Sequence, residues 1–367
     1  MNRFNNSENY NSVQINSTLE DNILSSNGTG SDTVPQWTVN FYFVFAFFGS
    51  LANLIYIFAI LTSKRNGTLL LVLQISFVDT ILFYVAILEI YTIQKRSWIF
   101  SAENCQFFSG MEIVMNTLIV YLLLCLNCHI ISLWNLNKFE VNKENNPLTS
   151  CRDDSDECLV TKNENKSNTA YRTRNIEVSV VFPSIFIWFV SVSLSIPSFT
   201  LSSILNVDEK YNMCGIEDGF YGEIMQKLLL VFKIVIPFSL LMFSLVVLVV
   251  IIFKTTRNRI NNSLTKKFTE IRILLIFSVL ITLCFFLTST QRNVLFVYHY
   301  FNLPFQNTDV NFIASPFFAN TQNSKMSLYF SMLYYTGSSV RGCLYFYVLP
   351  KFRHLLTNKV MCFDINK

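Results

Sequence analysis

A few ionisable side chains interrupt the long apolar segments of this chain, and they are its best candidates for chemistry. Only 14% of the 367 residues are charged. An ionised group at the centre of a bilayer costs at least ~2.5–3.5 kcal/mol, so it must face an opposite charge or a water-filled cavity. The following residues therefore predict buried ion pairs or a polar cavity: Asp79, Glu89, Glu112, Lys233, Arg292 and Arg341.

Other kinds of chemistry find no support in the residue patterns. The sequence has no phosphate-binding glycine loop and no nucleophile with a matching base. Cys151 and Cys158 flank an acidic run, but two widely spaced cysteines without histidine make a poor zinc pattern. We therefore expect no enzymatic activity, no metal and no cofactor. The net charge of +4 is too small to indicate nucleic acid as a partner.

The elements that carry these side chains are long apolar runs. The composition, 51% hydrophobic and 15% aromatic with a mean hydropathy of +0.39, is that of a membrane protein. Each run has roughly the 20 residues that a spanning helix requires. The sequence predicts an all-α membrane protein, a seven-transmembrane helix bundle in a lipid bilayer, with helices at about 37–62, 69–91, 106–134, 176–199, 228–253, 273–296 and 326–349.

The third run places three different groups at three depths. At ~1.5 Å per residue, Glu112 lies ~10 Å and His129 ~36 Å beyond Cys105, whereas the hydrocarbon layer is ~30 Å thick. We therefore expect Glu112 in the half of the membrane near Cys105, and His129 at the opposite surface.

The distribution of Lys and Arg predicts the orientation. If the amino terminus is outside, the inner segments hold 19 of the 28 basic residues and the outer segments hold 7. This bias favours an extracellular amino terminus.

Polar segments flank and interrupt the predicted bundle of residues 37–349. Residues 1–36 are rich in Asn and Ser, so we expect a disordered extracellular arm with candidate glycosylation sites at Asn5, Asn16 and Asn27. The inner loop 135–175 has mixed charge and is predicted to be flexible. In the basic, amphipathic tail of residues 350–367, Cys362 is a candidate lipidation site.

The order and spacing of several residues resemble the rhodopsin-like (class A) G-protein-coupled receptors. The resemblance covers nearly the whole chain except the arm and the inner loop. It is carried by Asn53 in Gly49-Ser-Leu-Ala-Asn53, Asp79 in Leu73-Gln-Ile-Ser-Phe-Val-Asp79, Trp98, Cys105, Trp188, Pro197, Pro237, and Tyr345 followed by Lys351-Phe352-Arg353. The resemblance implies a disulfide between Cys105 and Cys214, a membrane-parallel eighth helix in residues 350–367, and a heterotrimeric G protein as partner.

Three motifs depart from that family. His129-Ile130-Ile131 replaces Asp-Arg-Tyr, Cys284-Phe285-Phe286-Leu287 replaces Cys-Trp-x-Pro, and Arg341-Gly342-Cys343-Leu344-Tyr345 replaces Asn-Pro-x-x-Tyr. By resemblance, the residues that face a G protein are His129, Ile130, Ile131 and Tyr345. Tyr335 stands where an opsin has its retinal lysine, which argues against an opsin.

One predicted ion pair lies at mid-membrane. Asn53, Asp79 and Arg341 each lie nine or ten residues from the inner ends of their runs, a depth of ~14–15 Å. In the resembled family the matching Asp faces a pocket for sodium and water. We hypothesise that Arg341 fills this pocket and pairs with Asp79, steadied by Asn53. The alternative is that water and carbonyl groups satisfy each charge separately.

A second group of polar residues predicts a ligand cavity in the outer half. Its members are Glu89, Glu112, Lys233, Gln291 and Arg292. Amine receptors of the resembled family have an Asp at the place of Glu112. The mixed charges and the long outer loop 301–325 favour a peptide over an amine. The alternative for Lys233 and Arg292 is that they extend to the interface without a binding role.

These observations predict a plasma-membrane receptor that binds an extracellular ligand, a peptide more readily than an amine, and signals to heterotrimeric G proteins. A first alternative is a non-signalling decoy or scavenger receptor of the same fold, since the switch motifs are altered. A second is a seven-span chemoreceptor channel with its amino terminus inside, which the charge distribution opposes.

Overall fold

The computed structural model describes residues 36–62, 66–95, 97–145, 179–208, 211–216, 220–258, 266–302, 313–314 and 324–348. Several predictions lie outside these residues: the arm with Asn5, Asn16 and Asn27, most of the inner loop, and the tail with its eighth helix and Cys362.

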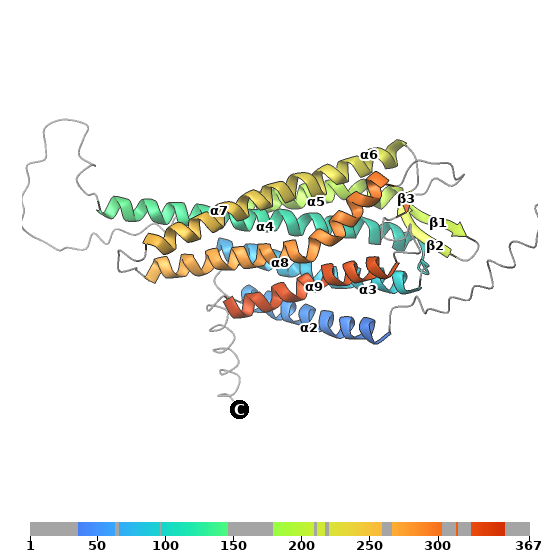
Figure 1. Ribbon diagram of the computed structural model, residues 1–367, viewed down its shortest axis with the longest axis horizontal. Coiled ribbons are helices and arrows are strands. Elements are labelled where there is room, and N and C mark those ends of the chain that lie inside the picture. The colour runs from blue at the N-terminus through green and yellow to red at the C-terminus, as the bar shows by residue number, and fades with distance from the viewer. Residues whose placement is uncertain are drawn as a thin grey trace, which may run out of the picture. The chain divides into compact units, whose positions relative to one another are not determined.

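The described part of the chain is almost entirely helical (Figure 1). Its helices are α2 (Gln36–Leu61), α3 (Gly67–Lys95), α4 (Ala102–Asn145), α5 (Val181–Leu201), α6 (Phe220–Leu229), the π-helix η2 (Leu230–Val235), α7 (Ile236–Asn258), α8 (Lys266–Asn302) and α9 (Ser324–Val348). The helices α6, η2 and α7 follow one another without a break.

Six helical segments among the described residues are long and apolar enough to cross a membrane. They are α2, α3, the part of α4 up to Lys138, α5, the continuous stretch Ile224–Arg257, and Thr269–Val297 of α8. The prediction of a mainly helical, multi-pass membrane protein is therefore confirmed. Helix α9 is not among the six, but it packs against α2, α3 and α8 and so belongs to the same bundle.

Helix α4 is the central element of the bundle. It packs against α3, α5, α7 and α8, and 78% of its most apolar 18-residue window is buried. The corresponding window of α5 is only 22% buried, and its outward face carries Phe182, Phe186 and Phe189. Large exposed aromatic side chains on a spanning helix are suited to lipid rather than to water.

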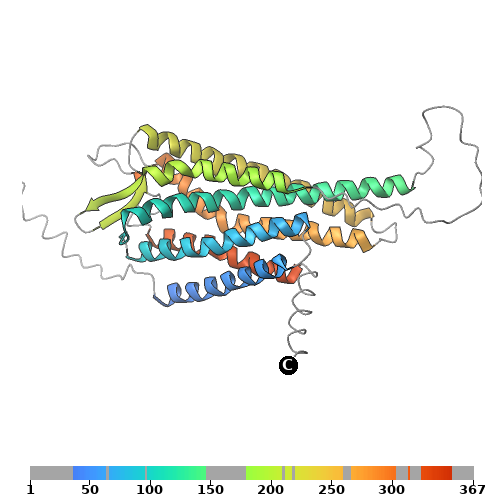
Figure 2. The ribbon, with the colours of Figure 1, turned by 180° about the vertical axis from the view of Figure 1, so that it is seen from behind.

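Several helices, α3, α4 and α8 among them, run further than the apolar runs predicted. α4 continues to Asn145 through the first part of the segment predicted as a loop, and its end projects beyond the neighbouring helices (Figure 1, Figure 2). No Pro or Gly occurs between Trp134 and Asn145, whereas Pro147 follows two residues later. Polar residues do not stop a helix, whereas the residue before a proline disfavours helical geometry. The end of the apolar run at Trp134 therefore predicted the end of the helix too early.

The structure also contains a small sheet that the sequence analysis did not predict. Strand β1 (Ser202–Asp208) pairs antiparallel with β2 (Tyr211–Ile216), and β2 pairs with the short β3 (Ile313–Ala314). The hairpin follows α5 directly, at the end of the bundle opposite the projecting end of α4 (Figure 2). The prediction of an all-α fold thus holds for the bundle and not for this connection.

Small residues allow α2 and α9 to approach closely. A Cβ at Gly49 would lie 1.9 Å from the Ser339 Oγ, whereas a Cβ at Gly342 would lie 3.3 Å from its nearest neighbour, the Asn53 Oδ1. We expect Gly49→Ala to destabilise the protein by ~1–3 kcal/mol, since the two backbones would have to separate. Thermal unfolding in detergent should show a clearly smaller loss for Gly342→Ala, the matched control on the same helix pair. Equal losses would contradict this account of the packing.

Candidate functional site

A disulfide joins the hairpin to the start of the central helix. Cys105 in the first turn of α4 bonds to Cys214 in β2, and both residues are buried. Trp98, which precedes α4, is also buried and donates its backbone N–H to the Asn212 carbonyl of β2 at 2.7 Å. The hairpin is therefore fixed at the end of the bundle where the outer-half polar residues were predicted.

Arg292 of α8 is the centre of a buried ionic cluster. Its Nη2 donates to the Glu89 Oε2 of α3 at 3.0 Å and to the Glu112 Oε1 of α4 at 2.6 Å. The guanidinium also lies over two rings of α9, 4.7 Å from the centroid of Tyr334 and 5.3 Å from that of Tyr335. One arginine thus connects four helices through ion pairs and cation–π contacts.

Both carboxylates of this cluster have further donors. Glu89 is 2% exposed and accepts hydrogen bonds from Ser331, at 2.7 Å, and from Tyr335. Glu112 accepts one from the Asn116 amide at 3.2 Å, and the Asn116 carbonyl oxygen in turn accepts the Tyr334 hydroxyl. These bonds supply the additional donors that a buried ion pair needs to offset desolvation.

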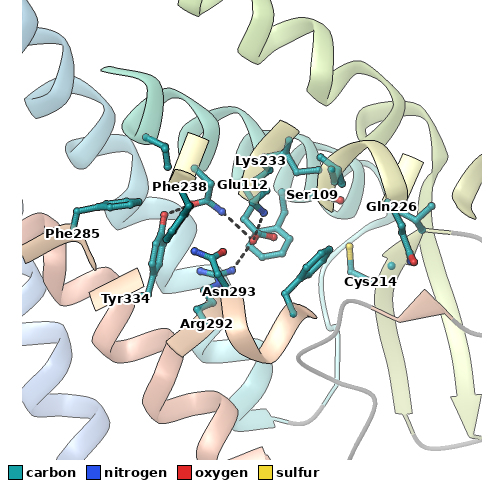
Figure 3. Close-up of a pocket in the computed structure, with 18 residues that line it drawn as sticks. Ser109, Glu112, Cys214, Gln226, Lys233, Phe238, Phe285, Arg292, Asn293 and Tyr334 are labelled. Atoms are coloured by element: carbon teal, nitrogen blue, oxygen red, sulfur yellow. Dashed lines mark hydrogen bonds and ion pairs between the residues drawn. The ribbon is translucent and has the colours of Figure 1, made fainter. Parts of the chain in front are cut away.

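A cavity of about 90 Å³ borders the cluster (Figure 3). Charged and polar groups line it together with an aromatic wall of Phe108, Phe238, Phe285 and Phe296. The polar lining comes from α4, α6, η2, α8 and α9, namely Ser109, Glu112, Asn116, Gln226, Lys233, Arg292, Asn293 and Tyr334. Cys214 and Gly215 of the hairpin complete the wall.

The π-helix η2 positions Lys233 at this cavity. In an α-helix the Ile236 N–H would bond to the Phe232 carbonyl, but here it donates to the carbonyl five residues back. The next residue, Pro237, has no N–H to offer in its place. The Tyr121 hydroxyl of α4 fills the gap, donating to the Phe232 carbonyl at 2.9 Å. The irregular turn that carries Lys233 is thereby satisfied from the central helix.

A second buried ion pair lies deeper in the bundle. The Arg341 Nε of α9 donates to the Asp79 Oδ2 of α3 at 3.0 Å, and its Nη2 bonds to the other carboxylate oxygen. Asp79 is fully buried and Arg341 is 3% exposed. The structure thus brings together the two residues hypothesised to pair, in a two-bonded geometry.

Asn53 takes a different role from the one hypothesised. Its Nδ2 donates to the Ser338 carbonyl of α9 at 3.3 Å, and within the described residues its Oδ1 has no hydrogen-bond partner. Asn53 therefore holds α2 to the backbone of α9, next to the ion pair and without a direct bond to it.

A third polar group lies between α4, α7 and α8. The Asn127 amide donates to the Ser244 Oγ at 2.9 Å and to the Thr282 Oγ1 at 3.1 Å, and its carbonyl oxygen accepts from Ser278. All four side chains are buried. Sequence analysis did not identify them because uncharged polar residues are common inside membrane helices and carry little signal alone.

The remaining predicted site residues do not lie where they were expected. Gln291 does not line the cavity, whereas Asn293 does, because residues two apart on a helix point in different directions. His129, predicted at the inner surface, is 6% exposed and lies well before the end of α4. Ile130 and Tyr345 are fully buried, and Ile131 is half-buried.

Asn116, Tyr334 and Ser331 belong to the cluster but were not singled out from the sequence. Asn116 and Tyr334 could have been found, since Asn116 lies one helical turn beyond Glu112 and Tyr334 precedes Tyr335. Ser331 has no such signal. Among the described residues, no three His, Cys, Asp or Glu side chains lie close enough to hold a metal ion.

The fold and the site define a multi-pass helical membrane protein with an ionised cavity at one end of its bundle. No protein-family model matches this chain, and no curated protein matches it significantly.

Proposed function

We propose that this chain is a cell-surface receptor of the rhodopsin-like G-protein-coupled kind, which binds an extracellular peptide and signals to heterotrimeric G proteins. The observation that carries the proposal is the cavity beside the disulfide-held hairpin, which ionised groups of α4, η2 and α8 line and which the ionic cluster with Glu89 of α3 borders. Aromatic walls with a few convergent polar groups are typical of ligand sites.

The proposal takes α9 as a seventh spanning helix. Its polar residues face other helices: Ser331 and Tyr335 contact Glu89, and Arg341 contacts Asp79. With these groups paired inside the bundle, the helix of 25 residues is long enough to span. Seven spans with the basic segments inside give an extracellular amino terminus and an extracellular hairpin.

Helix α8 provides a route from the cavity to the cytoplasmic half. It carries Arg292 in the ionic cluster and, further along, Ser278 and Thr282 in the polar group around Asn127. A ligand seated in the cavity contacts α8 at Arg292 and Asn293, and a shift of α8 there reaches the polar group around Asn127 along the same helix. We propose that this shift in α8 is the signal.

A non-signalling decoy or scavenger receptor is the second candidate. It is favoured by the Asp79–Arg341 pair, which joins α3 firmly to α9, and by the burial of His129 and Ile130, which leaves these residues without an exposed face for a G protein.

Two measurements test the proposal. An epitope tag before residue 1 should be accessible on intact cells, and one inserted between residues 146 and 175 only after permeabilisation; the reverse would exclude this class of receptor. In cells exposed to a synthetic peptide library, guanine-nucleotide exchange should rise on at least one G protein and be lost in Glu112→Gln. Peptide uptake without exchange on any G protein would favour the decoy.

A further inference from the structure

Lys233 differs from the other ionised residues of the cluster in how weakly it is held. Its Nζ lies 3.9 Å from the Glu112 Oε1, beyond hydrogen-bond distance, and 5.9 Å from the centroid of the Phe296 ring. Within the described part of the chain it makes no hydrogen bond. Its side chain is only 14% exposed, and it lines the cavity. An ammonium with three unused donors in such a place is suited to bind something the chain does not itself supply.

The carboxylates of the cluster are in the opposite situation. Glu89 accepts from Arg292, Ser331 and Tyr335, and Glu112 accepts from Arg292 and Asn116. Among the described residues the partners of Glu112 all contact its Oε1, and a ligand amine at the remaining Oε2 would lie beside two cations, Arg292 and Lys233, that already share this carboxylate. The cluster offers an incoming ligand a cation more readily than an anion.

Other donors stand near Lys233 in the cavity wall. Ser109 and Gln226 lie on its hairpin side, and Asn293 lies next to Arg292 (Figure 3). Across the residues that the structure describes, these three side chains make no hydrogen bond with the protein. Each has a donor in the wall of the cavity that Lys233 lines.

The size of the cavity limits what can enter. Its volume of about 90 Å³ is room for a handful of water molecules. A carboxylate with a short carbon stem fits this space, whereas a whole peptide does not. The part of the ligand that reaches the cluster is therefore a small group at a tip of the molecule.

We propose that Lys233 is the anchor for a carboxylate of the ligand, either a peptide's terminal carboxylate or an acidic side chain. On binding, the ligand carboxylate replaces Glu112 as the partner of Lys233, and Glu112 keeps Arg292 and Asn116. This change of partner breaks no hydrogen bond of the cluster, because Lys233 and Glu112 are too far apart to form one. The proposal names the ligand class for the receptor function proposed above and rests on it.

The test uses propionate, with propionamide as its uncharged isostere, on the purified full-length protein. The melting temperature of the wild type should rise saturably with propionate at constant ionic strength and should not rise with propionamide, since a ligand that binds only the folded state stabilises it. No difference between the two compounds in the wild type would overturn the proposal.

Variants assign the effect to Lys233. In Lys233→Met the apparent affinity for propionate should fall about tenfold or more, and Lys233→Arg should retain it. Lys227→Met removes an exposed charge from the adjoining helix α6 and should bind propionate like the wild type. Lys233→Gln provides the same measurement if the Met variant does not fold. Unchanged affinity in the Lys233 variants would overturn the proposal.

A defined pool of synthetic pentapeptides separates the two sources of carboxylate. Retention only of members with a free carboxyl end, and not of their amidated counterparts, identifies the terminus; retention only of members with Asp or Glu identifies a side chain. Retention independent of both contradicts the proposal. These outcomes are distinct from G-protein coupling. Propionate binding without nucleotide exchange supports the anion site and contradicts the signalling role. Nucleotide exchange driven by a ligand without an anionic group supports the signalling role and contradicts the anion site.

Discussion

Replacing Asp79 by Asn should destabilise the protein by ~3–5 kcal/mol and strongly reduce the amount that reaches the cell surface. The substitution leaves the Arg341 guanidinium, 3% exposed, without the carboxylate that accepts two of its N–H groups. An unpaired charge at this depth has neither water nor an opposite charge to stabilise it. Surface labelling and thermal unfolding in detergent measure both effects.

The double variant Asp79→Asn with Arg341→Asn should recover most of the loss, because it removes both charges together. Glu103→Gln is the matched control, since it neutralises an exposed carboxylate in the first turn of α4 and should have little effect. If the double variant is no better than Asp79→Asn alone, the pair is not what stabilises these helices.

Replacing Arg292 by Met should have an effect of similar size, ~3–5 kcal/mol, because it leaves Glu89 buried without its cation. It also removes the ion pair of 2.6 Å between α8 and α4 and the two cation–π contacts with α9. The melting temperature should fall, and any peptide-dependent nucleotide exchange should disappear.

Two variants separate the loss of the central cation from a general loss of charge. Lys233→Met removes the other basic residue of the cluster and should cost much less, since within the described residues Lys233 has no hydrogen bond and contacts Glu112 at 3.9 Å and the Phe296 ring at 5.9 Å. Adding Glu89→Gln to Arg292→Met should restore part of the stability. If Lys233→Met is as harmful as Arg292→Met, the cluster is not centred on Arg292.

The sequence predicted which ionised residues contact one another well, because an ionised side chain inside a membrane costs free energy unless it has a partner. Equal depth along the helices, together with the pocket of the resembled family, brought Asp79 and Arg341 together as a hypothesis. The same cost marked Glu89, Glu112, Lys233 and Arg292, and in the structure the four join one cluster beside one cavity. The depth of a residue does not predict the direction in which its side chain points around the helix axis, however. The sequence analysis therefore assigned Gln291 to the cavity and missed Asn293.

Features that depend on uncharged groups or on turns escaped prediction for physical reasons. The hairpin of β1 and β2 is too short to produce an apolar run, and β3 pairs with β2 across about a hundred residues of chain. Asn53 was expected to contact the ion pair, but an amide bonds equally well to a backbone carbonyl, and its Nδ2 donates to that of Ser338. The extension of α4 to Asn145 depends on a proline beyond the apolar segment.

The contacts of helix α9 depend on helices that are synthesised before it. It is the last of the described helices along the chain and is not among the six that could enter a bilayer by apolarity alone. Asp79 neutralises its arginine and Glu89 binds two of its hydroxyls; both belong to α3 and are translated about 240 to 260 residues earlier. In the proposed seven-helix arrangement, insertion of α9 is therefore assisted by its predecessors. A product truncated before α9 would keep the Glu89–Arg292 pair but would leave the Asp79 carboxylate in the membrane without its arginine, a target for degradation.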